Sequence, residues 1–282
     1  MRLPKWLKKP LSGGFGSNKT AADLHKRGLC TVCEEARCPN LPECYKQRRA
    51  TFLLLGSECT RKCSFCSVNH SRHPLPPDED ELYKVADYCR EHRLRHVVLT
   101  MVTRDDLPDG GAAHVVKVMQ TVRELVPEAA CELLTSDFDG NWEATQCLLE
   151  HKPEVFAHNI ETVRFLSSRI RSVATYDRSL QLLRRVKEKY PQQVTKSSLM
   201  VGLGETRDQI VEALFDLAQA GIDMVTIGQY LQPTPQQIAV KEWIEPELFE
   251  EYAETARELG IRDVMSGPFV RSSYAAHTLQ KA

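Results

Sequence analysis

The sequence lacks any apolar run long enough to span a membrane, and its positive and negative charges nearly cancel. No stretch approaches the roughly 20 apolar residues that a bilayer-spanning helix needs. Across 282 residues the formal net charge is -1, so no overall field would draw the chain onto nucleic acid or an anionic membrane. The sequence therefore predicts a protein with neither a membrane anchor nor a nucleic-acid partner.

The beginning of the chain lacks the apolar core of a secretory signal. Residues Met1 to Pro10 are basic, but Gly13, Gly14 and Gly16 follow in place of an apolar stretch. Serine is too sparse there to favour an organelle transit peptide. We therefore expect a cytoplasmic protein whose first 28 residues form an extended arm.

Cysteine, in contrast, is abundant. The chain has ten, and seven of them lie between Cys30 and Cys66. Disulfides are disfavoured in a reducing cytosol, so clustered thiols there indicate metal ligands or redox groups. Cys89, Cys131 and Cys147 lie apart from the cluster in helix and strand patterns, and we expect them to be small buried apolar residues.

From Thr51 onward, short β-rich runs alternate with amphipathic helical patterns. The expected strands are Thr51–Gly56, His96–Met101, Cys131–Thr135, Glu154–Ala157, Thr195–Val201 and Met224–Gly228. The expected helices are 79–92, 112–125, 141–150, 176–190, 206–220 and 246–260. Six strands that each lead into a helix predict an α/β fold, a partial (β/α)6 TIM-like barrel. An open doubly wound sheet is the alternative.

The spacing Cys59-x3-Cys63-x2-Cys66 follows the first expected strand. Chance would produce such a triplet in about one chain in a hundred of this composition. Three thiolates can hold three irons of a 4Fe–4S cluster and leave the fourth iron open for a small molecule. The alternative, a zinc site, usually takes four ligands in paired spacings, which an odd triplet fits poorly.

A second triplet, Cys33-x4-Cys38-x5-Cys44, precedes the first. By itself it is compatible with a zinc site or a redox pair, and Cys30-x2-Cys33 is also a common metal or disulfide spacing. Beside the first triplet, a second iron–sulfur cluster is the better interpretation. The role of Cys30 stays open.

The first triplet resembles the signature of the radical S-adenosylmethionine (SAM) superfamily, and longer motifs narrow the resemblance. The motifs are Val32-Cys-Glu-Glu-Ala-Arg-Cys-Pro-Asn40, Cys59-Thr-Arg-Lys-Cys63-Ser-Phe-Cys66, Val102-Thr-Arg-Asp-Asp-Leu-Pro-Asp-Gly-Gly-Ala112, His158-Asn-Ile-Glu-Thr162, Met200-Val-Gly-Leu-Gly-Glu-Thr206, Thr226-Ile-Gly-Gln-Tyr-Leu-Gln-Pro-Thr234 and Ser266-Gly-Pro-Phe-Val-Arg-Ser-Ser-Tyr274. Together they are similar to the lipoyl synthases over residues 30 to 275.

The resemblance implies insertion of two sulfurs at C6 and C8 of a protein-bound octanoyl-lysine, with two SAM molecules used per lipoyl group. It implies octanoylated carrier proteins as partners: lipoyl domains of 2-oxoacid dehydrogenases and the glycine cleavage H protein. It also implies an electron donor such as ferredoxin or flavodoxin and an iron–sulfur carrier protein. The basic arm (Arg2, Lys5, Lys8, Lys9) is expected to be a solvated tail, with contact to an acidic carrier domain as the alternative.

The resemblance also assigns residues and parts of the chain. Cys59, Cys63 and Cys66 would hold the SAM cluster, with no catalytic residue expected beyond the cluster ligands. The ligands of a sacrificial auxiliary 4Fe–4S cluster would be Cys33, Cys38, Cys44 and a serine, Ser273 in preference to Ser272. Residues 1–50 would form the arm and auxiliary-cluster module, 51–230 the radical SAM core, and 231–282 an extension closing over the auxiliary cluster.

Several other residues are candidates for contact with SAM. Asn159 and Glu161 follow the fourth expected strand, where side chains point into the mouth of a barrel; an exposed loop is the alternative. Gly202, Gly204 and Glu205 lie where a strand meets a helix, which suits either a ligand or a plain turn. The charged run Arg104 to Asp106 would contact ligand, order the rim or be solvated.

Two other functions remain open from the sequence. One is a different sulfur-inserting radical SAM enzyme, either biotin-synthase-like or an enzyme that methylthiolates RNA. No added RNA-binding domain is visible in the sequence. The other is a non-catalytic zinc or iron–sulfur scaffold, which would bind metal without cleaving SAM.

Overall fold

The computed structural model describes residues 2–9, 15–171 and 173–273, and the chain divides into two compact units. One unit contains the described parts of Leu11–Lys62 and Ser67–Glu154. We call it the three-stranded unit after β1, β4 and β5, which pair side by side in it. The four-stranded unit contains the described parts of Met1–Pro10, Cys63–Cys66 and Val155–Ala282. In the described residues, no helix is both long and apolar enough to cross a membrane.

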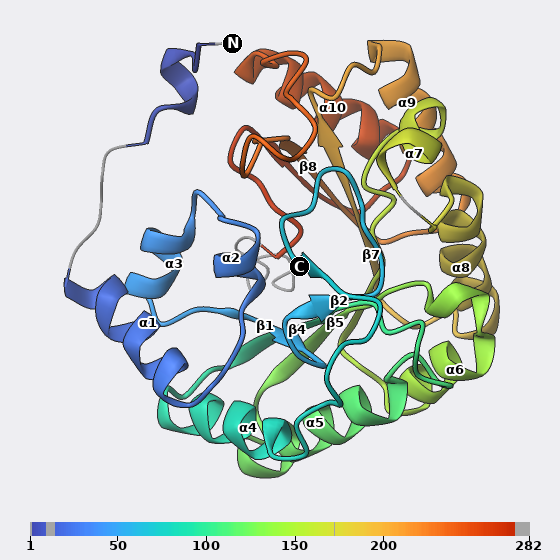
Figure 1. Ribbon diagram of the computed structural model, residues 1–282. Helices are drawn as coiled ribbons and strands as arrows, with labels where there is room; N and C mark the ends of the chain where they lie inside the picture. Colours follow the sequence, from blue (N-terminus) through green and yellow to red (C-terminus); the bar gives the residue numbers. More distant parts are fainter. Residues whose placement is uncertain (1, 10–14, 172, 274–282) are drawn as a thin grey trace. The chain divides into compact units, whose positions relative to one another are not determined.

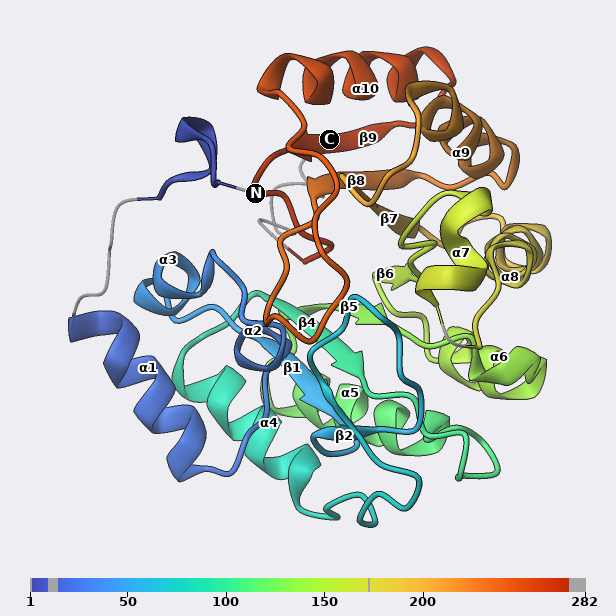
Figure 2. The same cartoon turned by 45° about the horizontal axis from the view of Figure 1, so that its top comes forward.

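In the three-stranded unit, β4 pairs in parallel with β1 on one side and with β5 on the other. The strands are β1 (Thr51–Leu54), β4 (His96–Met101) and β5 (Ala130–Leu134), with a small parallel pair of β2 (Glu58–Cys59) and β3 (Asn69–His70). The helices are α1 (Phe15–Lys26), α2 (Val32–Glu35), α3 (Leu41–Lys46), α4 (Glu81–Glu91), α5 (Ala112–Leu125), η2 (Phe138–Gly140) and α6 (Trp142–Glu150). Helices α4 and α5 lie side by side along the same face of the strands (Figures 1 and 2).

In the four-stranded unit, every strand is parallel to its neighbour in the order β6-β7-β8-β9. The strands are β6 (Val155–Ala157), β7 (Thr195–Val201), β8 (Met224–Gln229) and β9 (Asp263–Gly267). The helices are η1 (Lys5–Leu7), α7 (Arg164–Ile170), α8 (Tyr176–Lys189), α9 (Arg207–Gln219) and α10 (Pro246–Glu258). Each of β6, β7 and β8 is followed in the chain by at least one helix.

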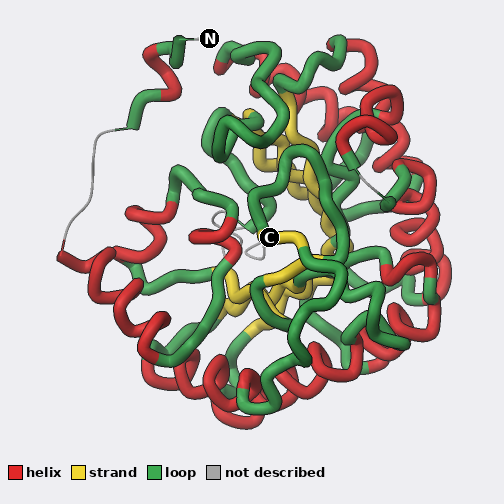
Figure 3. The backbone as a smooth tube through the Cα atoms, viewed as in Figure 1, coloured by secondary structure: helices red, strands yellow, loops and turns green. Residues whose placement is uncertain are grey.

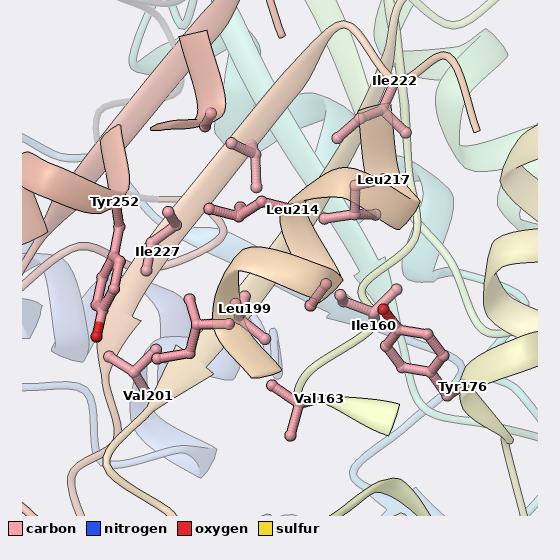
Figure 4. Packing of buried hydrophobic residues seen from close by; sticks show 14 of the residues in the cluster. Ile160, Val163, Tyr176, Leu199, Val201, Leu214, Leu217, Ile222, Ile227 and Tyr252 are labelled. Atoms are coloured by element: carbon pink, nitrogen blue, oxygen red, sulfur yellow. The ribbon is translucent and has the colours of Figure 1, made fainter. Parts of the chain in front are cut away.

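The core of the four-stranded unit forms between α9 and the strands it covers (Figure 4). Leu214 and Leu217 of α9 lie against Leu199 of β7 and Ile227 of β8, and all four side chains are fully buried. The helix can present this face because its apolar residues recur at intervals of three and four. Its start is fixed by a capping box, in which Thr206 and Gln209 each accept the other's backbone N–H.

The six expected strands and the helices between them are confirmed, and Figure 3 shows strands and helices alternating along both units. The fold is α/β with parallel strands, as expected. The predicted domain boundaries at residues 50 and 230 stay a prediction. Cys89 and Cys131 are fully buried as expected, whereas Cys147 is only half-buried.

Two expectations about secondary structure were wrong. The first 28 residues are not an extended arm, because 15–26 form α1 and 5–7 form a 3-10 turn. The buried positions of α1 are Ser17, Thr20 and Leu24, and two of the three are small polar residues without an apolar signal. The structure also adds β9, whose residues are all half-buried and so lack the alternation that marks a strand.

Candidate metal centres and cofactor contacts

The second cysteine triplet is carried by two short helices and the turn between them. Cys33 lies on α2, Cys44 lies on α3, and the N–H of Cys38 donates to the carbonyl of Cys33 at 2.9 Å. Thr31 caps α2, because its Oγ1 accepts the N–H of Glu34 at 3.3 Å. Pro42 occupies the first turn of α3, where its missing N–H costs nothing.

Tyr45, next to Cys44, ties these helices together. Its hydroxyl shares a 2.7 Å hydrogen bond with Oγ1 of Thr31, and its carbonyl accepts the hydroxyl of Thr20 on α1 at 2.8 Å. The side chain is fully buried, and burial raises the pKa of its hydroxyl. Helix α1, which the sequence did not predict, therefore also supports the second triplet.

The three thiols of this triplet lie close enough to affect one another. Burial raises the pKa of Cys33 to about 12, with a further contribution from the nearby Cys38 and Cys44 and an opposing one from hydrogen bonds with Thr51. The Cys33 thiol therefore stays protonated near neutral pH until a metal displaces the proton. Three thiols gathered in one place fit the ligands of an iron–sulfur cluster.

Cys30 has a different environment. Burial raises the pKa of its thiol, and the charges that add to the rise come from Glu34, Glu35 and Glu81. Its backbone carbonyl accepts the N–H of Leu53 on β1 at 2.9 Å. A thiol among carboxylates is poorly placed to be a thiolate ligand, so Cys30 stands apart from the triplet.

In the first triplet, Cys59 ends β2 and is held within the three-stranded unit. It pairs with His70 of β3, and its carbonyl accepts the N–H of Ser71 at 3.0 Å. The next residue, Thr60, donates both its N–H, at 2.9 Å, and its hydroxyl, at 3.0 Å, to the carbonyl of Thr103 after β4. The backbone around Cys59 is thereby fixed by the loop that follows β4.

Cys63 and Cys66 are held by residues of the four-stranded unit. Between them, Ser64 donates its N–H and its hydroxyl to the carbonyl of Ile170, at 2.9 and 3.2 Å. The Ser64 carbonyl accepts the N–H of Ile238 at 2.9 Å, and the Cys66 carbonyl accepts Nε2 of Gln237 at 3.2 Å. Hydrogen bonds therefore fix the backbone around both thiols.

Within the described residues, no three His, Cys, Asp or Glu side chains are grouped as the ligands of one metal ion. In a 4Fe–4S cluster each thiolate binds a different iron, so its ligands surround a cube and do not meet at one point.

The charged run after β4 is an internal brace of the loop. Arg104 is 1% exposed and donates to both carboxylate oxygens of Asp106, at 2.8 and 2.7 Å. Its Nη1 also donates to the carbonyls of Leu55, at 3.2 Å, and Leu75, at 3.0 Å. Of the roles left open from the sequence, these contacts favour ordering the rim. The alternative, that Arg104 is solvated, is wrong.

Asn159 and Glu161 lie just beyond β6, in a turn in which Glu161 has a φ of 65°. Nδ2 of Asn159 donates to Oε1 of Glu161 at 3.0 Å. Oδ1 of Asn159 is buried and has no hydrogen-bond partner among the described residues. Burial raises the pKa of Glu161, while Arg171 and Asn159 oppose the rise. A buried acceptor without a partner fits a site for a polar ligand.

Gly202 and Glu205 make contacts within their own turn. A Cβ on Gly202 would lie 2.2 Å from Nε2 of Gln229 and 2.5 Å from the carbonyl oxygen of Glu242, and its φ is 95°. The carboxylate of Glu205 accepts the N–H groups of Gly202 and Leu203. Gly204, with a φ of 109°, lies beside Lys241. The close approach at Gly202 is made by this chain itself, so the contact of this motif with SAM stays a prediction.

Ser273 is the last described residue, and the segment before it crosses β8. A Cβ on Gly228 would lie 2.1 Å from the carbonyl oxygen of Val270, so only glycine lets the segment lie this close. Lys9 lies over the ring of Phe269, with Nζ 4.6 Å from its centroid. Residue 274, the last of the Arg-Ser-Ser-Tyr motif, lies outside the described residues.

Two arginines near these sites were not singled out from the sequence. Arg61 lies between Cys59 and Cys63 and is buried against two aspartates, and Arg171 is buried near Glu161. The sequence offered one signal that Arg61 belongs to the site, namely its position inside the Cys-x3-Cys loop. Nothing in the sequence marked Arg171, because its partners, the carbonyl of Ile160 and the hydroxyl of Ser179, are not adjacent to it in the chain.

Known proteins resemble this chain in sequence and in fold. A family model described as the radical SAM superfamily matches residues 53–218. The chain is 47% identical over 278 residues to a lipoyl synthase of Protochlamydia amoebophila, covering 98% of this chain and 86% of the relative. It is 50% identical over 275 residues to a lipoyl synthase of Symbiobacterium thermophilum, with the same two coverages.

Among solved structures, a methylornithine synthase aligns with a TM-score of 0.56 at 15% identity, covering 91% of this chain and 84% of that chain. At that identity the likeness concerns the fold alone.

Proposed function

Because the chain belongs to the lipoyl synthase family of the radical SAM superfamily, we propose that it converts a protein-bound octanoyl-lysine to lipoyl-lysine. Membership makes it a sulfur-inserting radical SAM enzyme that uses SAM and a 4Fe–4S cluster. Two C–H bonds, at C6 and C8, are replaced by C–S bonds, so two SAM molecules are used per product.

The substrate explains why this chemistry needs a cofactor. An alkyl methylene has no acidic proton, so general acid–base groups of the protein have nothing to act on. When bound, the clusters and SAM supply a reductively generated radical that abstracts hydrogen and the sulfur that takes its place. The protein binds and orients the reactants and excludes water. This division of labour agrees with the expectation that no catalytic residue exists beyond the cluster ligands.

Cys59, Cys63 and Cys66 are the proposed ligands of the SAM cluster. Support comes from the hydrogen bonds that hold the backbone around the three thiols. Asn159 and Glu161 are proposed to contact SAM, with the unpartnered Oδ1 of Asn159 as the supporting observation.

The observation that carries the full reaction is the grouping of Cys33, Cys38 and Cys44. Cys38 and Cys44 both lie near Cys33, in a segment held by Tyr45, and the three thiols would supply ligands for a second cluster, which would be the sulfur source. Ser273 is proposed as the fourth ligand. Alkoxide oxygen matches cluster iron less well than thiolate does, so the iron it binds would leave most readily from a cluster that is to be dismantled.

The proposed partners follow from this reaction. They are octanoylated lipoyl domains of 2-oxoacid dehydrogenases, octanoylated glycine cleavage H protein, a ferredoxin or flavodoxin as electron donor, and an iron–sulfur carrier that rebuilds the auxiliary cluster. The cytoplasmic location expected from the sequence stays a prediction.

The test separates the two clusters. After anaerobic reconstitution, the wild-type chain should hold two 4Fe–4S clusters and convert an octanoyl-lysyl peptide to the lipoyl form with SAM and dithionite. The triple variant Cys33→Ala, Cys38→Ala, Cys44→Ala should hold one cluster and still release 5′-deoxyadenosine from SAM. It should form no lipoyl product, because the sulfur source is gone.

The matched control is Cys147→Ala, the same change at a half-buried thiol outside both triplets, which should keep both clusters and full product formation. Lipoyl product from the triple variant would overturn the role of the second cluster. Stoichiometric zinc in place of iron would overturn the proposed function as a whole.

A further inference from the structure

Arg61 lies inside the loop that carries the first cysteine triplet, yet its side chain points away from solvent and is 4% exposed. Its Nε and Nη2 donate to the two carboxylate oxygens of Asp105, each at 2.8 Å, and its Nη1 donates to Oδ1 of Asp137 at 2.5 Å. An arginine side chain stays charged in proteins, and here two carboxylates balance that charge. The group is therefore a permanent buried cation.

The two carboxylates come from different loops of the three-stranded unit. Asp105 follows β4, and its N–H donates to Oγ1 of Thr60 at 3.0 Å. Asp137 follows β5, is 0% exposed on its side chain, and accepts the N–H of Asp139 at the start of η2. One guanidinium thus fastens the Cys59 loop to the loops after both neighbouring strands. A lysine could not replace it, because a single ammonium lacks the planar fork that reaches both carboxylates.

The backbone of Arg61 links this brace to the metal ligand. Its N–H lies 3.4 Å from Sγ of Cys59 and donates to it. Hydrogen bonds to thiolate sulfurs are among the factors that set the reduction potential of an iron–sulfur cluster, and the groups that orient ligands also set metal affinity. The side chain of Arg61 fixes the peptide whose N–H performs this task.

We propose that Arg61, held by Asp105 and Asp137, is a positioning residue that pre-forms the Cys59 side of the SAM-cluster loop and maintains the N–H donor to Cys59. The inference rests on the proposed ligand role of Cys59, Cys63 and Cys66. It adds that the loop is set by the protein before iron arrives. Retention and potential of the cluster then depend on a salt bridge that touches neither iron nor SAM.

The experiment uses the full chain with the second triplet changed to alanine, so that every signal comes from the SAM cluster. Into this background we would introduce Arg61→Lys, Asp137→Asn and both together. Each single change should speed iron release to a chelator about 10- to 100-fold, the usual cost of losing a group that orients a metal ligand. The double variant should be no worse than the more damaging single one, because both remove the same brace.

A role in folding alone would not change the cluster's electronic properties. The midpoint potential should become more negative in Arg61→Lys, and the EPR signal of the reduced cluster should change, because the donor to Cys59 is weakened. Arg123→Lys is the matched control: Arg123 also pairs with a carboxylate, Glu154, in the same unit, and this variant should keep the parent's release rate and potential. If Asp137→Asn fails to fold, Asp105→Asn, at a side chain 30% exposed, takes its place.

The outcomes separate the two proposals. A parent-like release rate and potential in Arg61→Lys would overturn the inference, as would effects of the two single changes that add in the double variant. Cys59→Ala in the same background tests the ligand assignment independently. If that variant kept an unchanged cluster, the proposed function would fail. If it lost the cluster while Arg61→Lys behaved as the parent, only the role of Arg61 would fail.

Discussion

At the scale of single residues, the charged motif after β4 shows what burial does to side chains that look solvated in a sequence. Arg104 is almost fully buried, and Asp106 supplies the charge that balances it. The hydrogen bonds from Arg104 lower the pKa of Asp106 below its ordinary value of 3.8, although burial opposes the shift. A carboxyl group with a lowered folded-state pKa stabilises the fold above its unfolded pKa and loses that contribution as pH falls through the folded value.

Asp106→Asn should therefore cost about 1–3 kcal/mol of unfolding free energy near neutral pH, the usual size of a hydrogen bond to a charged group. The difference between wild type and variant should be constant above about pH 5 and shrink in acid, as Asp106 becomes protonated in the wild type. Urea denaturation of the apo-protein at a series of pH values measures this difference. A gap that stayed constant down to acid pH would show that the carboxylate does not carry the effect.

Single residues also show the limit of sequence reasoning about the site. Spacing along the chain is itself the signal for a ligand set, so the sequence predicts the six cysteines as cluster ligands, and that assignment stays a prediction. Gly202 was expected to make room for a ligand, yet the atoms nearest to it belong to Gln229 and Glu242. The sequence marks a position that needs glycine but does not say whether a ligand or distant backbone approaches it.

At the scale of elements, strands were easier to foresee than the helices that support the second triplet. A buried parallel strand is a continuous apolar run, such as Val97 to Leu99 in β4, and it is recognisable without its neighbours. Helix α1 has no such signal, because Ser17 and Thr20 form much of its buried face. Polar residues can occupy that face because the Thr20 hydroxyl donates to the carbonyl of Tyr45, a partner 25 residues away. The helix is thus stabilised by a contact that no local pattern records.

The hydroxyl of Tyr45 yields a prediction for the elements around the second triplet. Tyr45→Phe removes the hydroxyl that joins α3 to Thr31 at the start of α2, and the variant should lose about 1–2 kcal/mol of unfolding free energy. Amide hydrogen exchange in α2 and α3 should become faster, because their mutual hydrogen bond is lost. Both measurements are made on apo-protein, so that cluster binding cannot mask them. Tyr83→Phe is the control at an exposed tyrosine, and equal effects of the two changes would contradict the role given to Tyr45.

At the scale of the whole molecule, the alternation of strands and helices could be predicted, but the division into two compact units could not. Alternation is local and depends on short periodic patterns. The division depends on which side chains share a core, and that requires contacts between residues far apart in the sequence. It also assigns neighbours in the chain to different units, since Lys62 belongs to the three-stranded unit and Cys63 to the four-stranded unit.

Whether the two units open separately can be tested by removing buried side chains from each. Leu214 of α9 is fully buried in the core of the four-stranded unit, and Leu214→Ala should cost about 2–5 kcal/mol through lost burial and the cavity left behind. Because regions with their own core open as cooperative units, hydrogen exchange should rise most for amides of β7, β8 and α9. Leu99→Ala makes the same change in β4 of the three-stranded unit, where exchange should rise most for β1, β4 and β5. If either variant raised exchange equally in both sets of strands, the chain would open as one cooperative body and the two cores would not be energetically separate.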